Sequence, residues 1–264
     1  MLVAQGGRVV TRLIDRVVAI LAGLLCHGGF LFAVGAMAWA LAGGMQTGLG
    51  RVPAPWASLA NLGLALQFPL LHSVLLTSPG RALLGRCVPG ARGRTLVVTT
   101  FVIVTSAQLA AVFLLWTPTG TVWYVPAGLS GVLSYTLFLA SWMFLVRAIH
   151  DAGAGLQSGA IGWWALFRGR RPHFGGLPTE GLFRTCRQPI YLGFLLVLLT
   201  APTRSADQLL LVLVWGPYCI LAPRLKERRF LAIYGDEFAQ YQRAVPYFVP
   251  FPWKRHHDED HRGR

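Results

Sequence analysis

The chain has 264 residues, of which 24 are Lys or Arg and 10 are Asp or Glu, so its formal net charge is +14. Apolar residues make up 54% of the sequence and charged residues 13%, about half the charged share of a soluble domain. This balance excludes a disordered chain, a disulfide scaffold and a cytosolic enzyme, and it predicts an integral membrane protein.

Long uncharged runs mark the segments that we expect to cross the membrane. A membrane helix needs about 20 mostly apolar residues, and four runs of that order cover residues 17–42, 57–76, 95–116 and 122–146. Arg8, Arg12 and Arg16 precede the first run, as basic residues precede the apolar stretch of a signal peptide. The run is too long for such a stretch, so we interpret it as an uncleaved first span.

Two shorter apolar runs follow at 189–202 and 208–223, joined by the segment 202–207. Neither run alone reaches the usual length, so together they form either a short hairpin that crosses the membrane or one that re-enters it. With the four long runs they predict an all-α, integral membrane helical bundle of about six transmembrane helices.

The distribution of basic residues predicts the orientation. In this topology only Arg51 and Arg204 lie on the outer side, and the other 22 Lys and Arg fall within 8–16, 81–94, 147–187 and 224–264. Such an excess is typical of the cytoplasmic side. We therefore expect a multi-pass protein of the cell inner membrane with both termini cytoplasmic.

The organisation that follows is one integrated membrane domain with two regions. Residues 1–150 form a four-helix membrane region, and residues 151–264 carry the motifs described below. Between them, 150–172 reads as an interfacial linker, in which Trp163 and Trp164 suit the headgroup layer. The basic excess is explained by the membrane, so we expect no nucleic acid partner; the oligomeric state is not indicated.

The first informative motif lies before the fifth run. Pro189 suits the first turn of a helix because its missing N–H would be unpaired there. Arg187 and Gln188 then lie at the mouth of this helix, where backbone N–H groups bind anions readily. Tyr191 follows Arg187 by four residues, a spacing that places both on one helix face.

The second motif follows the sixth run. Aromatic and apolar residues recur at steps of three and four from Phe230 to Tyr241, which predicts an amphipathic interfacial helix beginning at Arg224. Glu227 is the only acid near the inner end of the sixth run. Taken without the first motif, it pairs with Arg224 or Arg228, and Arg187 extends toward lipid phosphates.

Together the two motifs resemble the membrane methyltransferases related to isoprenylcysteine carboxyl methyltransferase and the phospholipid methyltransferases. Those proteins carry Arg-His-Pro-x-Tyr-x-Gly before a short hairpin, and a Glu-Glu pair, Phe/Tyr-Gly, Tyr and Val-Pro after it. The match covers about 181–250 and consists of Arg187, Pro189, Tyr191, Gly193, Glu227, Tyr234, Gly235, Tyr241, Val245 and Pro246.

The other half of the chain carries a narrower resemblance, to bacterial methanethiol S-methyltransferase relatives and to a membrane family linked to nitric-oxide reduction. It consists of Leu71-His72-Ser73, Arg94-Thr95, Trp116 with Pro118, and Val122-Trp123, with Ala201-Pro202-Thr203 added in the hairpin turn. Two positions depart from the superfamily pattern: Gln188 replaces the histidine and Lys226 replaces the first glutamate. Gln188 can form hydrogen bonds but cannot take a proton.

The resemblance implies methyl transfer from the cofactor S-adenosyl-L-methionine without a metal. It implies that Arg187 pairs with the cofactor carboxylate and that Glu227 takes its hydroxyl groups or ammonium. Gln188, Tyr191 and Gly193 complete the expected cofactor-binding set, while His72 and Tyr241 are expected on the substrate side. The acceptor is small or lipophilic, with a thiol favoured over a prenylcysteine carboxylate or a lipid amine.

Polar residues inside the spans allow more than one interpretation. His27 and His72 are functional candidates because ionisable groups are costly in a membrane, and a haem held by both is a rival interpretation that their different depths argue against. His72 either lines the substrate pocket or forms an interhelical hydrogen bond; Asn61 and Gln67 are expected to do the latter. Two further candidate classes are a non-enzymatic assembly or lipid-binding protein and a reductase-type membrane protein.

The cysteines and the charged C-terminal tail give little indication of function. Cys26 and Cys219 fall in apolar runs and are expected as buried thiols, and the four cysteines have no metal-ligand spacing. The histidines between 256 and 261 belong to a tail that we expect to be disordered and charged.

Overall fold

The structure is a computed structural model that describes residues 2–249, with side chains from residue 11 onward; the histidine-rich tail lies outside the described residues. Ten α-helices occupy most of this part of the chain, together with one 3-10 turn and two very short strands. The helices are α1 (Leu2–Ala42), α2 (Trp56–Leu75), α3 (Ser78–Leu84), α4 (Ala91–Leu115), α5 (Gly128–Asp151), α6 (Ala154–Gln157), α7 (Ala160–Arg168), α8 (Pro189–Thr200), α9 (Ala206–Tyr234) and α10 (Asp236–Ala244). The strands are β1 (Val122–Tyr124) and β2 (Arg204–Ser205), and the 3-10 turn is η1 (Gly181–Arg184). The predicted all-α class is confirmed.

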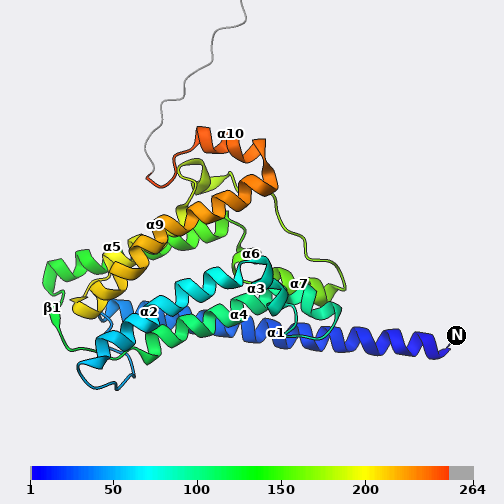
Figure 1. Ribbon diagram of the computed structural model, residues 1–264, viewed down its shortest axis with the longest axis horizontal. Helices are drawn as coiled ribbons and strands as arrows, with labels where there is room; N and C mark the ends of the chain where they lie inside the picture. Colours follow the sequence, from blue (N-terminus) through cyan, green and yellow to red (C-terminus); the bar gives the residue numbers. More distant parts are fainter. Residues whose placement is uncertain (1, 250–264) are drawn as a thin grey trace, which may run out of the picture.

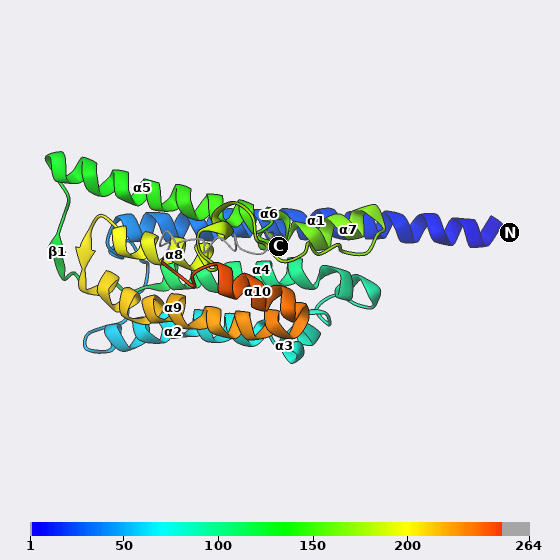
Figure 2. The same ribbon diagram turned by 90° about the horizontal axis from the view of Figure 1, so that it is seen from above.

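Five of the described helices are long and apolar enough to span a membrane: α1 from Thr11, α2, α4, α5 and α9. They lie side by side with the shorter α8, and the N-terminal part of α1 extends beyond the bundle (Figure 1). Figure 2 shows the same arrangement from above. The first four predicted spans are confirmed, except that the fourth begins at Gly128 because residues 122–124 form β1.

The hairpin of α8 and α9 passes through the bundle, although α8 has only 12 residues and a length of roughly 18 Å. The chain continues in an extended form after α8, and β2 pairs antiparallel with β1. Thr203 Oγ1 donates to the Ala42 carbonyl (2.8 Å) and Ser205 Oγ to the Gly44 carbonyl (2.5 Å). The hairpin turn therefore meets the C-terminal end of α1 and the α4–α5 connection, so the hairpin extends to the same end of the bundle as these segments.

Helix α9 is longer than the sequence predicted. It runs without interruption from Ala206 to Tyr234, so the predicted end at residue 223 is wrong. The amphipathic helix is α10, which begins at Asp236 and not at Arg224. Gly235 separates the two helices with a φ of +53°, a conformation that favours glycine.

The segment predicted as an interfacial linker is instead packed into the bundle. Helix α7 lies against α1 and α4, with Gly162 buried. A side chain at Gly162 would collide with Thr99 Oγ1, 2.5 Å from the Cβ position. Trp163 Nε1 donates to His27 Nε2 (3.0 Å), so this tryptophan contacts α1.

A polar cluster lies at the end of the bundle that holds the hairpin turn. Asp207, in the first turn of α9, is 1% exposed. It accepts hydrogen bonds from Gln46 Nε2 (2.8 Å), Asn61 Nδ2 (3.3 Å), Trp116 Nε1 (3.0 Å) and both the backbone N–H (2.9 Å) and the hydroxyl (2.8 Å) of Thr119. We call these five residues the Asp207 cluster. It joins the segments that follow α1 and α4 to α2 and to the first turn of α9.

Two sequence expectations about side chains inside the spans are confirmed. Asn61 bonds to the Thr117 carbonyl (2.7 Å) beyond α4, and Gln67 bonds to the Gln108 carbonyl of α4 (3.1 Å), so both form interhelical hydrogen bonds. Cys26 and Cys219 are buried free thiols.

Candidate functional site

The site begins where α8 starts. Pro189 occupies the first turn of α8, as its sequence position predicted, and Gln188 is the N-cap residue. The backbone N–H of Arg187 donates to the Pro246 carbonyl (2.9 Å). The mouth of α8 is therefore attached to the segment that follows α10, about sixty residues later in the chain.

Arg187 uses nearly all of its donors within the protein. Nε and Nη2 donate to the two carboxylate oxygens of Glu227 (2.9 and 3.3 Å), and Nη1 donates to the carbonyls of Gln242 (2.7 Å) and Val245 (2.6 Å). Four of the five guanidinium N–H groups are thus engaged. The side chain is 12% exposed and its guanidinium lies 5.6 Å from the centre of the Tyr247 ring.

Glu227 is the acceptor on which this arrangement converges. Besides Arg187, Gln188 Nε2 donates to Oε1 (2.8 Å) and Gln242 Nε2 donates to Oε2 (2.8 Å). These four hydrogen bonds account for the usual acceptor capacity of a carboxylate. Glu227 therefore pairs with neither Arg224 nor Arg228. Its contacts with Arg187 and Gln188 bring the two motifs, forty residues apart in the chain, into direct contact.

The two departures from the superfamily pattern contact each other. Lys226 Nζ donates to Gln188 Oε1 (3.4 Å), while the amide nitrogen of Gln188 donates to Glu227. The ammonium also lies 5.8 Å from the Phe183 ring centre and 5.2 Å from that of Phe230. Lys226 has no carboxylate partner in the described residues, so it brings one uncompensated positive charge beside the Arg187–Glu227 pair. We call Arg187, Gln188, Lys226, Glu227 and Gln242 the Glu227 cluster.

The turn η1 is anchored from both sides. Tyr241 of α10 donates its hydroxyl to the Phe183 carbonyl (2.7 Å), and burial raises the pKa of this phenol above its ordinary value, so the hydroxyl stays a donor. The backbone N–H of Leu182 donates to Asp151 (2.9 Å) at the end of α5. Gly181 has a φ of +59°, and a side chain there would collide with the Asp151 carboxylate.

Two other expected site residues lie on α8. Gly193 is buried against α5, and a Cβ there would come within 3.0 Å of Leu145 Cα, so helix packing accounts for this glycine. Tyr191 is partly buried in the core between α8 and α9, within electrostatic reach of Tyr218 and Tyr247. Tyr191 lies three residues after Gln188, in the first turn of α8.

The two membrane histidines have different surroundings. His27 of α1 receives a hydrogen bond from Trp163, as described above. His72 of α2 packs against Phe68 and Phe101, with ring centres 5.3 and 5.0 Å away. The His72 ring nitrogen Nδ1 is buried and has no hydrogen-bond partner in the described part of the chain. The expected interhelical hydrogen bond is therefore not made by this atom.

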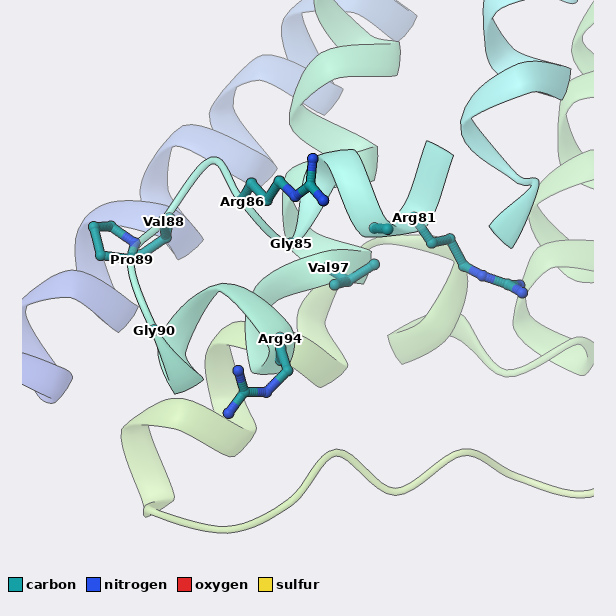
Figure 3. A pocket seen from close by; sticks show the side chains of 9 residues that line it. Arg81, Gly85, Arg86, Val88, Pro89, Gly90, Arg94 and Val97 are labelled. Carbon is teal, nitrogen blue, oxygen red and sulfur yellow. The ribbon is translucent and has the colours of Figure 1, made fainter. Parts of the chain in front are cut away.

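A separate hollow opens between α3 and α4, with a volume of about 500 Å³. Arg81, Arg86 and Arg94 line it together with small and apolar residues, and Figure 3 shows these three side chains pointing away from one another. Such a spread suits contacts with several lipid headgroups better than one ligand.

Three residues with evident roles were not assigned to the site from the sequence. Gln242 and Asp207 carried no motif, and Lys226 was read only as a departure. Asp207 did carry a signal, since it is one of only ten acidic residues and lies between two apolar runs.

Fold and site together define a multi-pass helical membrane protein in which an arginine–glutamate pair joins the start of α8 to α9, next to the amphipathic helix α10. Comparison with curated proteins finds relatives named methanethiol S-methyltransferase. One from Crocosphaera subtropica is 27% identical over 200 residues, which is 75% of this chain and 77% of the relative. One from Bradyrhizobium diazoefficiens, named methanethiol S-methyltransferase 2, is 27% identical over 220 residues, or 83% of this chain and 82% of the relative. One from Mycobacterium tuberculosis is 28% identical over 205 residues, or 76% and 81%.

These similarities extend over most of the chain, so the resemblance that the motifs indicated is confirmed. No family model matches the chain. No solved structure matches it either.

Proposed function

We propose that the protein is a membrane methyltransferase that transfers a methyl group to a small thiol. The observation that carries this proposal is the similarity to methanethiol S-methyltransferases over about three quarters of the chain. It is supported by the direct meeting of the two motifs in the Glu227 cluster. A haem protein, a reductase and an assembly factor have no comparable support, and His27 Nε2 already accepts a hydrogen bond from Trp163.

The methyl donor in this proposal is S-adenosyl-L-methionine, which supplies an electrophilic methyl group on a positive sulfur. S-adenosyl-L-methionine also carries a carboxylate, so its binding site needs a cationic side chain with N–H groups that are not already used within the protein. Arg187 has one N–H left, but the Lys226 ammonium has donors to spare and no carboxylate partner in the described residues. We therefore assign the carboxylate to Lys226, with Arg187 behind it.

The remaining expected site residues keep distinct proposed roles. Arg187 and Glu227 are positioning residues, because they hold each other and fix Gln188 and the mouth of α8. Gln188 and Tyr191 face the cofactor as hydrogen-bonding or packing groups, and Gly193 contributes by allowing α8 to approach α5. Tyr241 fixes η1 at the edge of the site, and His72 lies on the substrate side. Dryness and positioning supply the acceleration, and no metal is needed.

The protein is proposed to lie in the cell inner membrane with both termini cytoplasmic. The support is the excess of Lys and Arg in the segments that join the helices at the end of the Glu227 cluster. A water-soluble donor then reaches the cluster from the cytoplasm, while a small or lipophilic acceptor enters from the bilayer.

The test is incubation of the purified protein with methyl-labelled S-adenosylmethionine and a panel of thiols, amines and carboxylates. Transfer to small thiols, with far less to amines and carboxylates, is the expected result. Calorimetry with the cofactor and with reduced nicotinamide, run in parallel, distinguishes an inactive preparation from a different enzyme class. Cofactor binding without transfer to any thiol contradicts the proposed acceptor.

A further inference from the structure

His72 is the buried side chain in this bundle whose chemistry the fold leaves unused. Three buried side-chain polar atoms lack a hydrogen-bond partner in the described residues: His72 Nδ1, Gln108 Oε1 and Trp142 Nε1. An amide oxygen does not take a proton near neutral pH, and an indole N–H is only a donor. His72 Nδ1 is the one of the three that can accept a proton, and leaving it unpaired has a cost in free energy.

The His72 ring lies between α2 and α4, because it packs against Phe68 of α2 and Phe101 of α4. His72 is three residues from the end of α2, which is about 4.5 Å along the helix axis. The next residue, Ser73, shares a hydrogen bond with the hydroxyl of Tyr218 on α9 (3.3 Å). His72 therefore lies near the C-terminal end of α2, next to Ser73, the residue that joins α2 to α9.

The charged group that faces this region is Arg229 of α9, whose guanidinium donates to the Leu76 carbonyl (3.4 Å) just after α2. The Phe68 and Phe101 rings complete the surroundings of the imidazole, and Phe68 also contacts Trp215 at 5.2 Å. An aromatic wall with one uncommitted nitrogen is suited to a small apolar molecule that has a single acidic hydrogen. A small thiol has this character.

We propose that His72 Nδ1 is the general base that takes the proton of the acceptor thiol. The inference rests on the proposed function, because it requires a thiol acceptor. The nucleophile in such a transfer is the thiolate. The S–H bond breaks and its proton goes to Nδ1; the thiolate sulfur then bonds to the methyl carbon as the carbon–sulfonium bond breaks, which leaves a neutral thioether on the donor. The imidazolium afterwards releases the proton to water.

The test uses thiols of different acidity. His72→Asn places an amide near the position of Nδ1 but cannot accept the proton. With an alkanethiol, which is protonated at neutral pH, kcat/KM is expected to fall by about 10²- to 10⁴-fold, the usual contribution of a general base. With an acidic aromatic thiol, which is already a thiolate, the same variant is expected to lose less than about threefold.

His27→Asn is the matched control, since His27 is the other histidine in a membrane helix. Its Nε2 is held by Trp163, so any loss in this variant should be the same for all thiols. His72→Gln is measured beside His72→Asn, and cofactor affinity by calorimetry and thermal unfolding are recorded for each, so that a folding defect in one variant does not decide the result.

The outcomes separate the two proposals. Losses that do not depend on thiol acidity in the His72 variants overturn the role of His72 and leave the proposed function intact. A wild-type protein that binds the cofactor but methylates neither thiol overturns the proposed function itself. Losses confined to the weakly acidic thiols support the base.

Discussion

Helix α9 carries a buried carboxylate near each end, and the two are held in opposite ways. Asp207 is 1% exposed and accepts five hydrogen bonds from neutral donors only. Glu227 is 7% exposed and is held by an arginine and two glutamines, with Lys226 beside it. The first arrangement uses up every nearby donor, whereas the second leaves an ammonium free. In the Asp207 cluster every described donor is paired with the carboxylate, which stabilises the fold. In the Glu227 cluster the Lys226 ammonium has no carboxylate partner among the described residues, so it is available to pair with an anionic ligand.

The largest effect is expected at the closed end. Asp207→Ala leaves the donors of Gln46, Asn61, Trp116 and Thr119 unpaired in a buried place, so the free energy of unfolding should fall by about 4 kcal/mol. Thermal unfolding in detergent or lipid nanodiscs measures this. Asp236→Ala is the control, because Asp236 is also in the first turn of a helix but is exposed; its effect should stay below about 1 kcal/mol. A similar small loss for Asp207→Ala would contradict the closed-cluster interpretation.

Next in size is the Arg187–Glu227 pair. Arg187→Met or Glu227→Leu alone strands a buried charge and should cost about 3 kcal/mol. The double variant should cost less than the sum of the two by about 2 kcal/mol, since it strands neither charge. Unfolding of all four proteins gives this coupling. Purely additive losses would mean that the pair is not a unit and that each residue acts through other partners.

A smaller effect separates binding from folding at Lys226. Lys226→Met should weaken S-adenosylmethionine binding about tenfold, or about 1.4 kcal/mol, with little change in the unfolding temperature. A cofactor analogue without the carboxylate should bind both proteins equally. Arg228→Met is the control for a basic side chain two positions away on an exposed part of α9. If Lys226→Met weakens binding of the analogue as much as binding of S-adenosylmethionine, Lys226 does not bind the carboxylate.

The smallest effect concerns the anchor of η1. Tyr241→Phe removes the hydrogen bond to the Phe183 carbonyl and should lower the free energy of unfolding by about 1 kcal/mol. Tyr234→Phe is the matched control, since the hydroxyl of Tyr234 has no hydrogen-bond partner in the part of the chain that the structure describes. Equal effects of the two substitutions would show that the Tyr241 hydrogen bond contributes no measurable stability.

The spans were predictable because hydrocarbon tolerates few charges, so uncharged runs and membrane helices coincide. The predicted ends of the helices were wrong where the helix boundary does not coincide with the edge of an uncharged run. Arg224–Arg229 looked like the start of an interfacial helix, but a helix can leave the hydrocarbon without ending, and α9 continues to Gly235. Likewise residues 122–124 are apolar but pair as β1 with β2, a contact eighty residues away that no local pattern contains.

The order of the motifs in the chain indicated which residues form the candidate site, but it did not indicate which of them contact one another. Arg187 and Glu227 contact each other in the structure, and their expected role in binding the cofactor stays a prediction. The two departures from the superfamily pattern contact each other, because the Lys226 ammonium donates to the Gln188 side-chain oxygen. Gln188 and Lys226 are 38 residues apart in the chain, so a single sequence does not show that they are in contact.

The spacing of the two carboxylates along α9 has a consequence for the surrounding lipid. Twenty residues of helix separate Asp207 from Glu227, about 30 Å, but Arg224 and Lys226 lie within this stretch, so its uncharged part, 208–223, is about 24 Å long and shorter than a typical hydrocarbon layer. The helix thus fixes a hydrophobic length for the whole bundle. In a bilayer of much shorter or longer acyl chains, either the bilayer changes thickness around the protein or the helices tilt. Acyl-chain length is therefore expected to affect the Glu227 cluster through the tilt of α9.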